Sequence, residues 1–378
     1  MNKTGSVKFG ILWNSLQQFG QLGITFVSTI ILARLLTPED YGIYGILMIF
    51  ISVSEMLADS GIAGYIIKKQ NVTPIYYDTL FVYNMCVSGI MYLFLFFSAP
   101  FIADFYEKEM LISVIRILGL VLLLHAFSIT QFTRLLKDLQ FHKLALISIV
   151  AGVAALCVAL LLAYRGLGIW ALIFQQLVLV ALTTILYLVV NRRIPHFRFD
   201  MRVFKEQFAF GINLFGSSVL MAITNNIGNN IIAKIFSMNI AGLYVQAVRL
   251  QNYPLSMVSN VVDKTFFPIF SKMNDDWRLL KEQICKLRRL LYAVLFPLFS
   301  VAICFAKPIV SIVLGEKWLG SVSYFQILML ASFPLLVKAL NRNVLKSFGF
   351  TAVIFRIEVY SAVLLLFCLF IAFLFKSI

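Results

Sequence analysis

The hydrophobic positions of this chain gather into long runs that are separated by short polar breaks. Most runs are about 20 residues long, which is the length that an α-helix needs to cross a bilayer. The pattern predicts an all-α, polytopic membrane protein with about 11 transmembrane helices. Their expected ranges are 11–34, 42–67, 79–102, 112–133, 144–164, 168–190, 208–233, 241–262, 290–314, 322–345 and 354–375.

Basic residues are unevenly divided between the two sides of this topology. With the amino terminus inside, most of the 32 Lys and Arg residues fall on the cytoplasmic side. Since cytoplasmic loops carry the excess of Lys and Arg, we predict a multi-pass membrane protein with a cytoplasmic amino terminus. The two longest loops, 191–207 and 263–289, are basic and weakly amphipathic, and we expect them to form surface helices on anionic headgroups.

Composition excludes several classes of protein. The 378 residues are 61% hydrophobic and 13% charged, whereas a soluble chain is about half apolar and about a quarter charged. The net charge of +15 is spread between apolar runs and forms no continuous face, so we expect no nucleic-acid partner. The sequence has no catalytic signature, and its three histidines and scattered cysteines have no metal-ligand spacing. We therefore expect neither an enzyme nor a metal site.

Two stretches 200 residues apart share one pattern. ARLLTPEDYGIY begins at Ala33 and AKIFSMNIAGLY begins at Ala233, so Arg34 aligns with Lys234 and Gly42 with Gly242. Both copies start on the same side, because six predicted helices separate them. The pattern predicts two pseudo-symmetric lobes related by an axis along the membrane normal, as in many transporters. The lobes would be 1–190, with six helices, and 200–378, with about five; the alternative is chance similarity between apolar helices.

Several segments together resemble a known family. LARLLTPEDYGIYG from Leu32, LADSGIAGYIIKK from Leu57, FPIFSKM from Phe267, GEKW from Gly315 and the run that begins at Leu328 are similar to the oligosaccharide flippases of the polysaccharide transporter family. That family belongs to the multidrug/oligosaccharidyl-lipid/polysaccharide (MOP) superfamily. The resemblance implies a MATE-like fold with two lobes facing a central cavity. The chain ends after its eleventh predicted helix, so we expect an incomplete second lobe.

Polar side chains recur on one face of the first and seventh predicted helices. Because they are expensive at lipid depth, such residues usually face a cavity or a partner helix. Amides and hydroxyls suit a sugar, since they donate to and accept from its hydroxyls. The alternative is that they bind neighbouring helices together. The set includes Asn14, Gln17, Gln18, Gln21, Thr25, Ser28, Asn213, Ser217, Thr224, Asn225, Asn229 and Asn230, and the sugar-binding candidates are Gln18, Gln21, Asn225 and Asn229.

Four cations near or inside apolar runs are candidates for binding a pyrophosphate. They are Arg249, Arg34, Lys234 and Arg116, and a guanidinium matches phosphate oxygens in a bidentate manner. Arg249 is the first choice, because no acid lies close to it in sequence. The alternative for Arg34 and Lys234 is that they reach the outer headgroups or pair with nearby acids.

Two acids in the second predicted helix are candidates for ion coupling. Glu55 and Asp59 are four residues apart and share a face, which suits H⁺ or Na⁺ coupling. The alternative is a structural pair with a lysine such as Lys68. His125 offers a proton relay or, alternatively, an interhelical hydrogen bond. We expect no other cofactor.

Three functions fit these features. The resemblance implies a flippase that moves polyprenyl-pyrophosphate-linked oligosaccharide units to the outer leaflet for cell-surface polysaccharide (O-antigen, capsule or exopolysaccharide) synthesis by alternating access. The expected partners are then the bilayer, the lipid-linked oligosaccharide, a polysaccharide polymerase and glycosyltransferases. The alternatives are a MATE-like multidrug extruder, which would favour acidic over basic cavity residues, and a non-transporting membrane scaffold.

Overall fold

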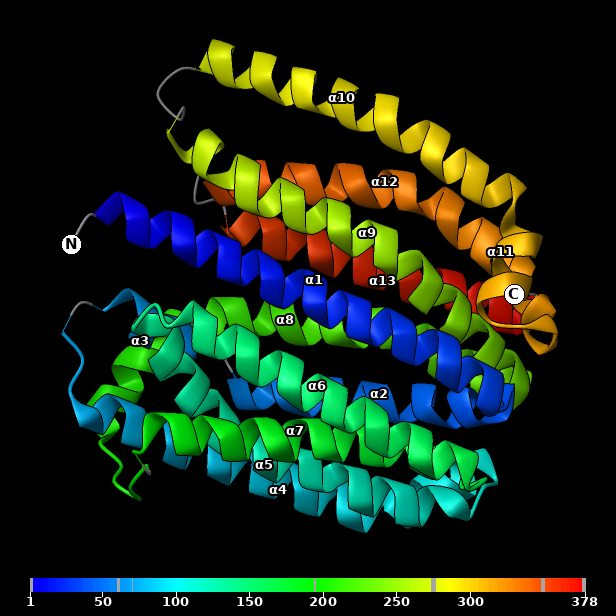
Figure 1. The fold of residues 1–378 in the computed structure, drawn as a ribbon, viewed down its shortest axis with the longest axis horizontal. Coiled ribbons are helices and arrows are strands. Elements are labelled where there is room, and N and C mark those ends of the chain that lie inside the picture. Colours follow the sequence, from blue (N-terminus) through cyan, green and yellow to red (C-terminus); the bar gives the residue numbers. More distant parts are fainter. Residues whose placement is uncertain are drawn as a thin grey trace.

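The computed structural model describes residues 3–59, 62–69, 71–193, 195–272, 277–347 and 351–375 (Figure 1). The described chain is a bundle of long helices, with no strand among these residues. The helices are α1 (Lys3–Leu35), α2 (Pro38–Asp59), α3 (Ile62–Lys68), α4 (Pro74–Tyr106), α5 (Met110–Lys137), α6 (Phe141–Tyr164), α7 (Ile169–Asn191), α8 (Met201–Ile235), α9 (Met238–Lys272), α10 (Trp277–Cys304), α11 (Ala306–Val313), the 3-10 helix η1 (Glu316–Ser321), α12 (Val322–Ser347) and α13 (Thr351–Phe375).

The predicted all-α membrane fold is confirmed, and the described residues of each predicted range lie mostly in helix. Within the described residues, 6 helices are long and apolar enough to cross a membrane, or up to 7 if a bent pair counts as one span. That pair is α10 and α11, which bend by 74° where the sequence predicted one helix over 290–314. The break follows from Pro308, because a proline ring clashes with the carbonyl four residues earlier, here that of Cys304. The predicted helix 42–67 is likewise divided, into α2 and α3.

The prediction of separate surface helices in the two basic loops is wrong. The basic residues of the second loop extend the neighbouring long helices instead, because α9 continues to Lys272 and α10 already begins at Trp277. In the first loop, Arg192, Arg193 and Arg198 lie in the irregular linker between α7 and α8. At the start of α8, the Asp200 carboxylate accepts hydrogen bonds from the backbone N–H groups of Arg202 and Val203, at 2.7 and 3.3 Å. This N-cap satisfies donors that a helix start leaves free, so α8 begins well before its apolar segment.

The linker before α8 is docked on the N-terminal half of the chain. The His196 N–H donates to the Asp78 carboxylate at 3.1 Å, and the Asp200 N–H donates to the Thr79 hydroxyl at 3.2 Å. Phe197 packs on Phe81 with ring centroids 5.2 Å apart. α8 consequently packs against α2, α3 and α4 as well as against α9 and α13. The boundary between two lobes near residues 190–200 stays a prediction.

The two repeat-related helix pairs meet at one end of the bundle. We call the end at which α1 begins the amino end (left in Figure 1) and the other the opposite end. The turn between α1 and α2 and the turn between α8 and α9 both lie at the opposite end, where Gly42 contacts Met238. The two helix pairs therefore run in the same direction, as a parallel repeat requires. The main apolar core also reaches this end, with Leu32, Tyr41 and Trp318 fully buried.

Candidate functional site

At the opposite end, α2 and α9 cross through two glycines that the repeat aligns. A Cβ atom added to Gly42 would lie 1.9 Å from the carbonyl oxygen of Met238, and one added to Gly242 would lie 1.7 Å from that of Pro38. Only glycine lets two backbones approach so closely. The two contacts are reciprocal, since both glycines and both carbonyls are 200 residues apart. A pseudo-two-fold axis therefore passes through this crossing.

The repeat-related cations hold helix ends across the same crossing. The Arg34 guanidinium donates to the carbonyl of Ile312 in α11 at 2.6 Å. Lys234 donates to the carbonyl of Phe105 in α4, and its ammonium lies 3.4 Å from the Glu107 carboxylate. Cations near a helix C-terminus satisfy the carbonyls that the helix leaves free. Each cation thus links one half of the chain to the other, and their role in binding pyrophosphate stays a prediction.

The GEKW segment caps the end of α1 from the C-terminal half. The Trp318 indole N–H donates to the carbonyl of Ala33 at 2.8 Å, and its ring meets Tyr41 edge-on with centroids 5.4 Å apart. Lys317 donates to the carbonyls of Arg34 and Leu36. We refer to the crossing, both repeat cations, Lys317 and Trp318 together as the seal. It joins the two halves of the chain at the opposite end of the bundle.

Arg249 lies directly beside the seal, on α9. Its guanidinium carbon is 5.1 Å from the ring centroid of Tyr41 and 5.1 Å from that of Tyr44, both on α2. Cation–π contacts are worth about 2 kcal/mol when desolvated, so the rings fix this side chain. None of the ion pairs among the described residues involves Arg249. Its charge is therefore positioned by aromatic rings without being neutralised by a carboxylate.

Tyr253, one helical turn from Arg249, connects α9 to α1. Its hydroxyl is 2.7 Å from the Thr29 hydroxyl and donates to the carbonyl of Thr25 at 3.1 Å. Phe26 packs edge-on against the same ring at 5.0 Å. Residues four apart share a helix face, so Arg249 and Tyr253 face the N-terminal half together. We call Arg249, Tyr41, Tyr44 and Tyr253 the cation cluster.

The polar residues of α1 divide into two groups. Gln17 donates to Ser148 of α6 at 3.0 Å, and Gln175 of α7 donates to Ser28 at 2.7 Å. These two positions bind helices of the same half together. Gln21 is exposed and Gln18 is half-buried, and neither has a side-chain bond to another helix among the described residues. Gln17 and Ser28 of α1 thus have side-chain partners on other helices, whereas Gln18 and Gln21 have none among the described residues.

The candidates on α8 also differ from one another. Asn225 is exposed, whereas the side-chain oxygen of Asn229 is buried beside Gly45 of α2. The Asn230 side-chain oxygen accepts a hydrogen bond from the Tyr106 hydroxyl at 3.0 Å, which joins α8 to α4. The side chains of Asn14, Asn213 and Ser217 lie outside the described residues.

Thiol labelling should separate these groups. In a chain whose native cysteines are replaced, Gln21→Cys and Asn225→Cys should react with a membrane-impermeant thiol reagent, because both side chains are exposed. Gln17→Cys is the matched control and should stay unreactive against α6. Protection of Gln21→Cys and Asn225→Cys alike would mean that lipid, rather than water, covers them.

The remaining candidates make no hydrogen bond or ion pair with the cation cluster among the described residues, although Glu55 interacts electrostatically with Tyr44 of that cluster. The Arg116 guanidinium lies 4.2 Å from the Phe96 ring centroid of α4, and its Nε is buried without a partner. Glu55 is half-buried with no hydrogen bond or ion pair to the described residues, while the Asp59 side chain lies outside them. The Nδ1 atom of His125 is buried and unpartnered. Ion coupling by Glu55 and Asp59 stays a prediction.

The sequence interpretation missed three ion pairs among the described residues, one of which joins Lys108 and Glu39 at 2.7 Å. Lys69 and Glu206 are 3.1 Å apart at the amino end. The Tyr65 and Tyr76 hydroxyls also donate hydrogen bonds to the Glu206 carboxylate. Lys69 and the two hydroxyls together hold the pKa of Glu206 below its usual value. Lys338 and Glu358 are 2.9 Å apart between α12 and α13. Glu358 is the one carboxylate in the predicted helix 354–375, and this isolated acid was the signal that the sequence offered.

The Lys338–Glu358 pair should contribute to stability. Lys338→Ala leaves the nearly buried Glu358 carboxylate, 7% exposed, without its partner. We expect unfolding of the purified protein to become easier by about 1–3 kcal/mol, seen as a lower melting temperature. The double variant Lys338→Met/Glu358→Gln should recover most of the loss, and Lys307→Ala, at an exposed lysine, should cause none. An unchanged melting temperature for Lys338→Ala would contradict this assignment.

A solved structure shares this architecture. It is the inward-facing conformation of a multidrug resistance MATE family transporter of the MOP superfamily, with a TM-score of 0.64 and 15% identity over 90% of this chain and 87% of that one. At this identity the likeness shows the fold. The fold and the parallel repeat define a multi-pass helical membrane protein with the same architecture as that structure.

The chain belongs to the polysaccharide biosynthesis protein family, whose profile matches residues 31–323. Teichuronic acid biosynthesis protein TuaB of Bacillus subtilis is 26% identical over 92% of this chain and 72% of its own length. Lipopolysaccharide biosynthesis protein WzxC of Escherichia coli is 24% identical over 84% of this chain and 65% of its own. Succinoglycan biosynthesis transport protein ExoT of Rhizobium meliloti is 24% identical over 81% and 62%. The chain thus spans less than two thirds of the length of WzxC and ExoT.

Proposed function

We propose that this protein moves polyprenyl-pyrophosphate-linked oligosaccharide units across the cytoplasmic membrane for surface polysaccharide synthesis. The observation that carries the proposal is Arg249, an ion held between Tyr41 and Tyr44 at the crossing of the two halves without a neutralising acid. Arg249 is half-buried. A cation inside the membrane that is not paired with an acid is costly, so such residues usually mark a substrate path. A pyrophosphate supplies the oxygens that a guanidinium binds in a bidentate manner.

The names of the relatives point to the same cargo. Three of them are biosynthesis proteins for teichuronic acid, lipopolysaccharide and succinoglycan, and the last is named as a transport protein. A saccharide needs many hydrogen bonds and little charge for its recognition, which the exposed amides Gln21 and Asn225 can provide. The headgroup would accordingly place its pyrophosphate at Arg249 and its sugar along α1 and α8.

Alternating access would proceed by opening the seal. The basic amino end faces the cytoplasm in this proposal, in keeping with the positive-inside rule. Arg34, Lys234 and Lys317 hold the opposite end through backbone carbonyls, and these bonds can be exchanged for bonds to water when the halves separate. Such rocking of one half against the other is the usual transition of this kind of transporter.

A multidrug extruder is the second candidate, and the likeness to a MATE multidrug transporter favours it. Such an extruder would transport cations, so the sequence analysis expected acidic rather than basic residues in its cavity. The Arg249 guanidinium at the crossing would repel such a cargo, and the Glu55 carboxylate, which interacts electrostatically with Tyr44 in the same region, would have to attract it instead. The charge of the cluster therefore favours an anionic substrate.

Deletion of the gene tests the proposal. Cells that lack it should lose the surface polysaccharide and accumulate the lipid-linked oligosaccharide, and a plasmid copy of the full chain should reverse both changes. The same cells should grow normally on cationic dyes. Unchanged polysaccharide together with dye sensitivity would instead identify the multidrug extruder.

A further inference from the structure

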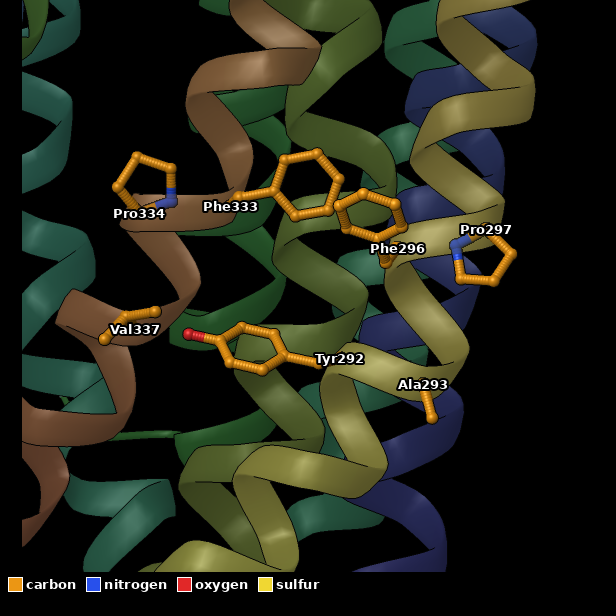
Figure 2. A pocket seen from close by; sticks show the side chains of 7 residues that line it. All are labelled: Tyr292, Ala293, Phe296, Pro297, Phe333, Pro334 and Val337. Atoms are coloured by element: carbon orange, nitrogen blue, oxygen red, sulfur yellow. The ribbon is translucent and has the colours of Figure 1, made fainter.

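An apolar groove of about 800 Å³ lies between α10 and α12 (Figure 2). Tyr292, Ala293, Phe296 and Pro297 line it from α10, and Phe333, Pro334 and Val337 line it from α12. Figure 2 shows the Tyr292 ring extending from α10 toward Val337.

The two helices meet on one side of this groove through their aromatic rings. Phe333 packs against Phe296 and Phe299 with centroids 5.1 and 5.3 Å apart. Both helices carry an internal proline here, Pro297 in α10 and Pro334 in α12. A proline inside a helix kinks it. The groove is therefore a fixed recess and not a flat helix surface.

The groove face of α10 continues into two arginines. Arg288 is four residues before Tyr292 and Arg289 is three before it, so all three lie on one face toward the amino end. Both arginines are exposed, and neither belongs to an ion pair among the described residues. An apolar recess that ends in unpaired cations complements an amphiphile with a long apolar chain and an anionic head.

α12, which lines this recess, also packs against α9, the helix that carries Arg249. Gln251 of α9 donates to the carbonyl of Leu328 at 2.6 Å and to the Ser332 hydroxyl at 3.0 Å, next to Phe333 of the groove. A lipid in the groove would have its head at Arg288 and Arg289, toward the amino end, and its chain against α12, which contacts the helix that carries Arg249. This position suits a lipid that is to be transported.

We propose that the α10–α12 groove is a capture site for the carrier lipid, with the isoprenoid chain between the helices and the pyrophosphate at Arg288 and Arg289. The inference rests on the proposed function, which requires such a lipid. Within a bilayer, lipid tails are as apolar as the groove, so the hydrophobic effect adds little. Affinity therefore comes from the arginines together with van der Waals packing of the isoprenoid chain in the groove, whose shape selects the branched chain over straight acyl chains.

Binding by the purified full chain tests this capture site. The probe is a long-chain polyprenyl pyrophosphate, followed by native mass spectrometry, with phosphatidylglycerol as competitor. Ala293→Phe fills the groove and should weaken binding about tenfold, a change of about 1.4 kcal/mol. Val301→Phe adds a ring to another exposed position of α10 and is the matched control. Arg288→Gln/Arg289→Gln should weaken the pyrophosphate lipid and leave a neutral polyprenol unchanged, while Arg202→Gln should have no effect.

The outcomes separate this inference from the proposed function. Binding that Ala293→Phe leaves unchanged, or that phosphatidylglycerol displaces at equal concentration, would overturn the capture site and leave the flippase proposal standing. Failure of the unaltered chain to bind polyprenyl pyrophosphate at all would overturn both. Weaker binding by Ala293→Phe alone, with Val301→Phe unaffected, is the expected result.

Discussion

Replacing Arg249 by alanine should abolish export of the lipid-linked oligosaccharide. The substitution removes the cation that Tyr41 and Tyr44 position at the crossing, and a hydrogen bond to a charged group is worth about 1.5–3 kcal/mol. Two such bonds to a pyrophosphate correspond to a fall in transport rate of at least about 100-fold. Surface polysaccharide and the amount of protein in the membrane, measured in the same cells, give the result.

The conservative variant distinguishes binding from packing. Arg249→Lys keeps the charge but loses the bidentate geometry, so we expect partial export. Arg249→Met keeps much of the bulk without charge and should behave as the alanine variant does. Normal export by Arg249→Ala would remove this residue from the site, and loss of the protein from the membrane would reveal a structural role instead.

Gly42→Ala should block closure of the opposite end and so stop transport. The new methyl group would meet the Met238 carbonyl oxygen at 1.9 Å, and that oxygen belongs to a backbone that cannot yield as a flexible side chain can. The two helices must then separate, which breaks the neighbouring contacts of Trp318 and Lys317. We expect export to fall at least about tenfold, in the range that 1–3 kcal/mol of overpacking produces.

Labelling measures the opening itself. A cysteine placed at Leu36, which is 2% exposed, should be unreactive in the parent chain and reactive beside Gly42→Ala. Gly242→Ala should have the same effect because its contact with Pro38 is reciprocal, and Gly89→Ala is the control, since a Cβ there meets nothing within 4 Å. Normal export by both crossing variants, with correctly folded protein, would show that transport does not use this closed state.

Sequence reasoning found the helices because the membrane imposes one length on every span. It aligned the two crossing glycines at equivalent positions of the repeat, but it did not predict that their helices cross there. A sequence repeat shows which residues are equivalent and does not show how the two copies pack against each other. The carbonyl partners of Arg34 and Lys234 have no sequence signal, because every residue carries a carbonyl. Arg249 was recognisable as a cation without a nearby acid, whereas its aromatic partners 200 residues away were not.

Transport by the purified chain is the most direct test of the proposed function. The protein is reconstituted into liposomes with a fluorescent polyprenyl-pyrophosphate-linked oligosaccharide, and a membrane-impermeant quencher reports how much of it lies in the outer leaflet. We predict that the accessible fraction changes with time only when the chain is present, and that Arg249→Ala liposomes behave as protein-free ones do. Equal rates with and without protein would contradict the account, as would movement of a neutral polyprenyl glycoside as fast as that of the pyrophosphate-linked lipid.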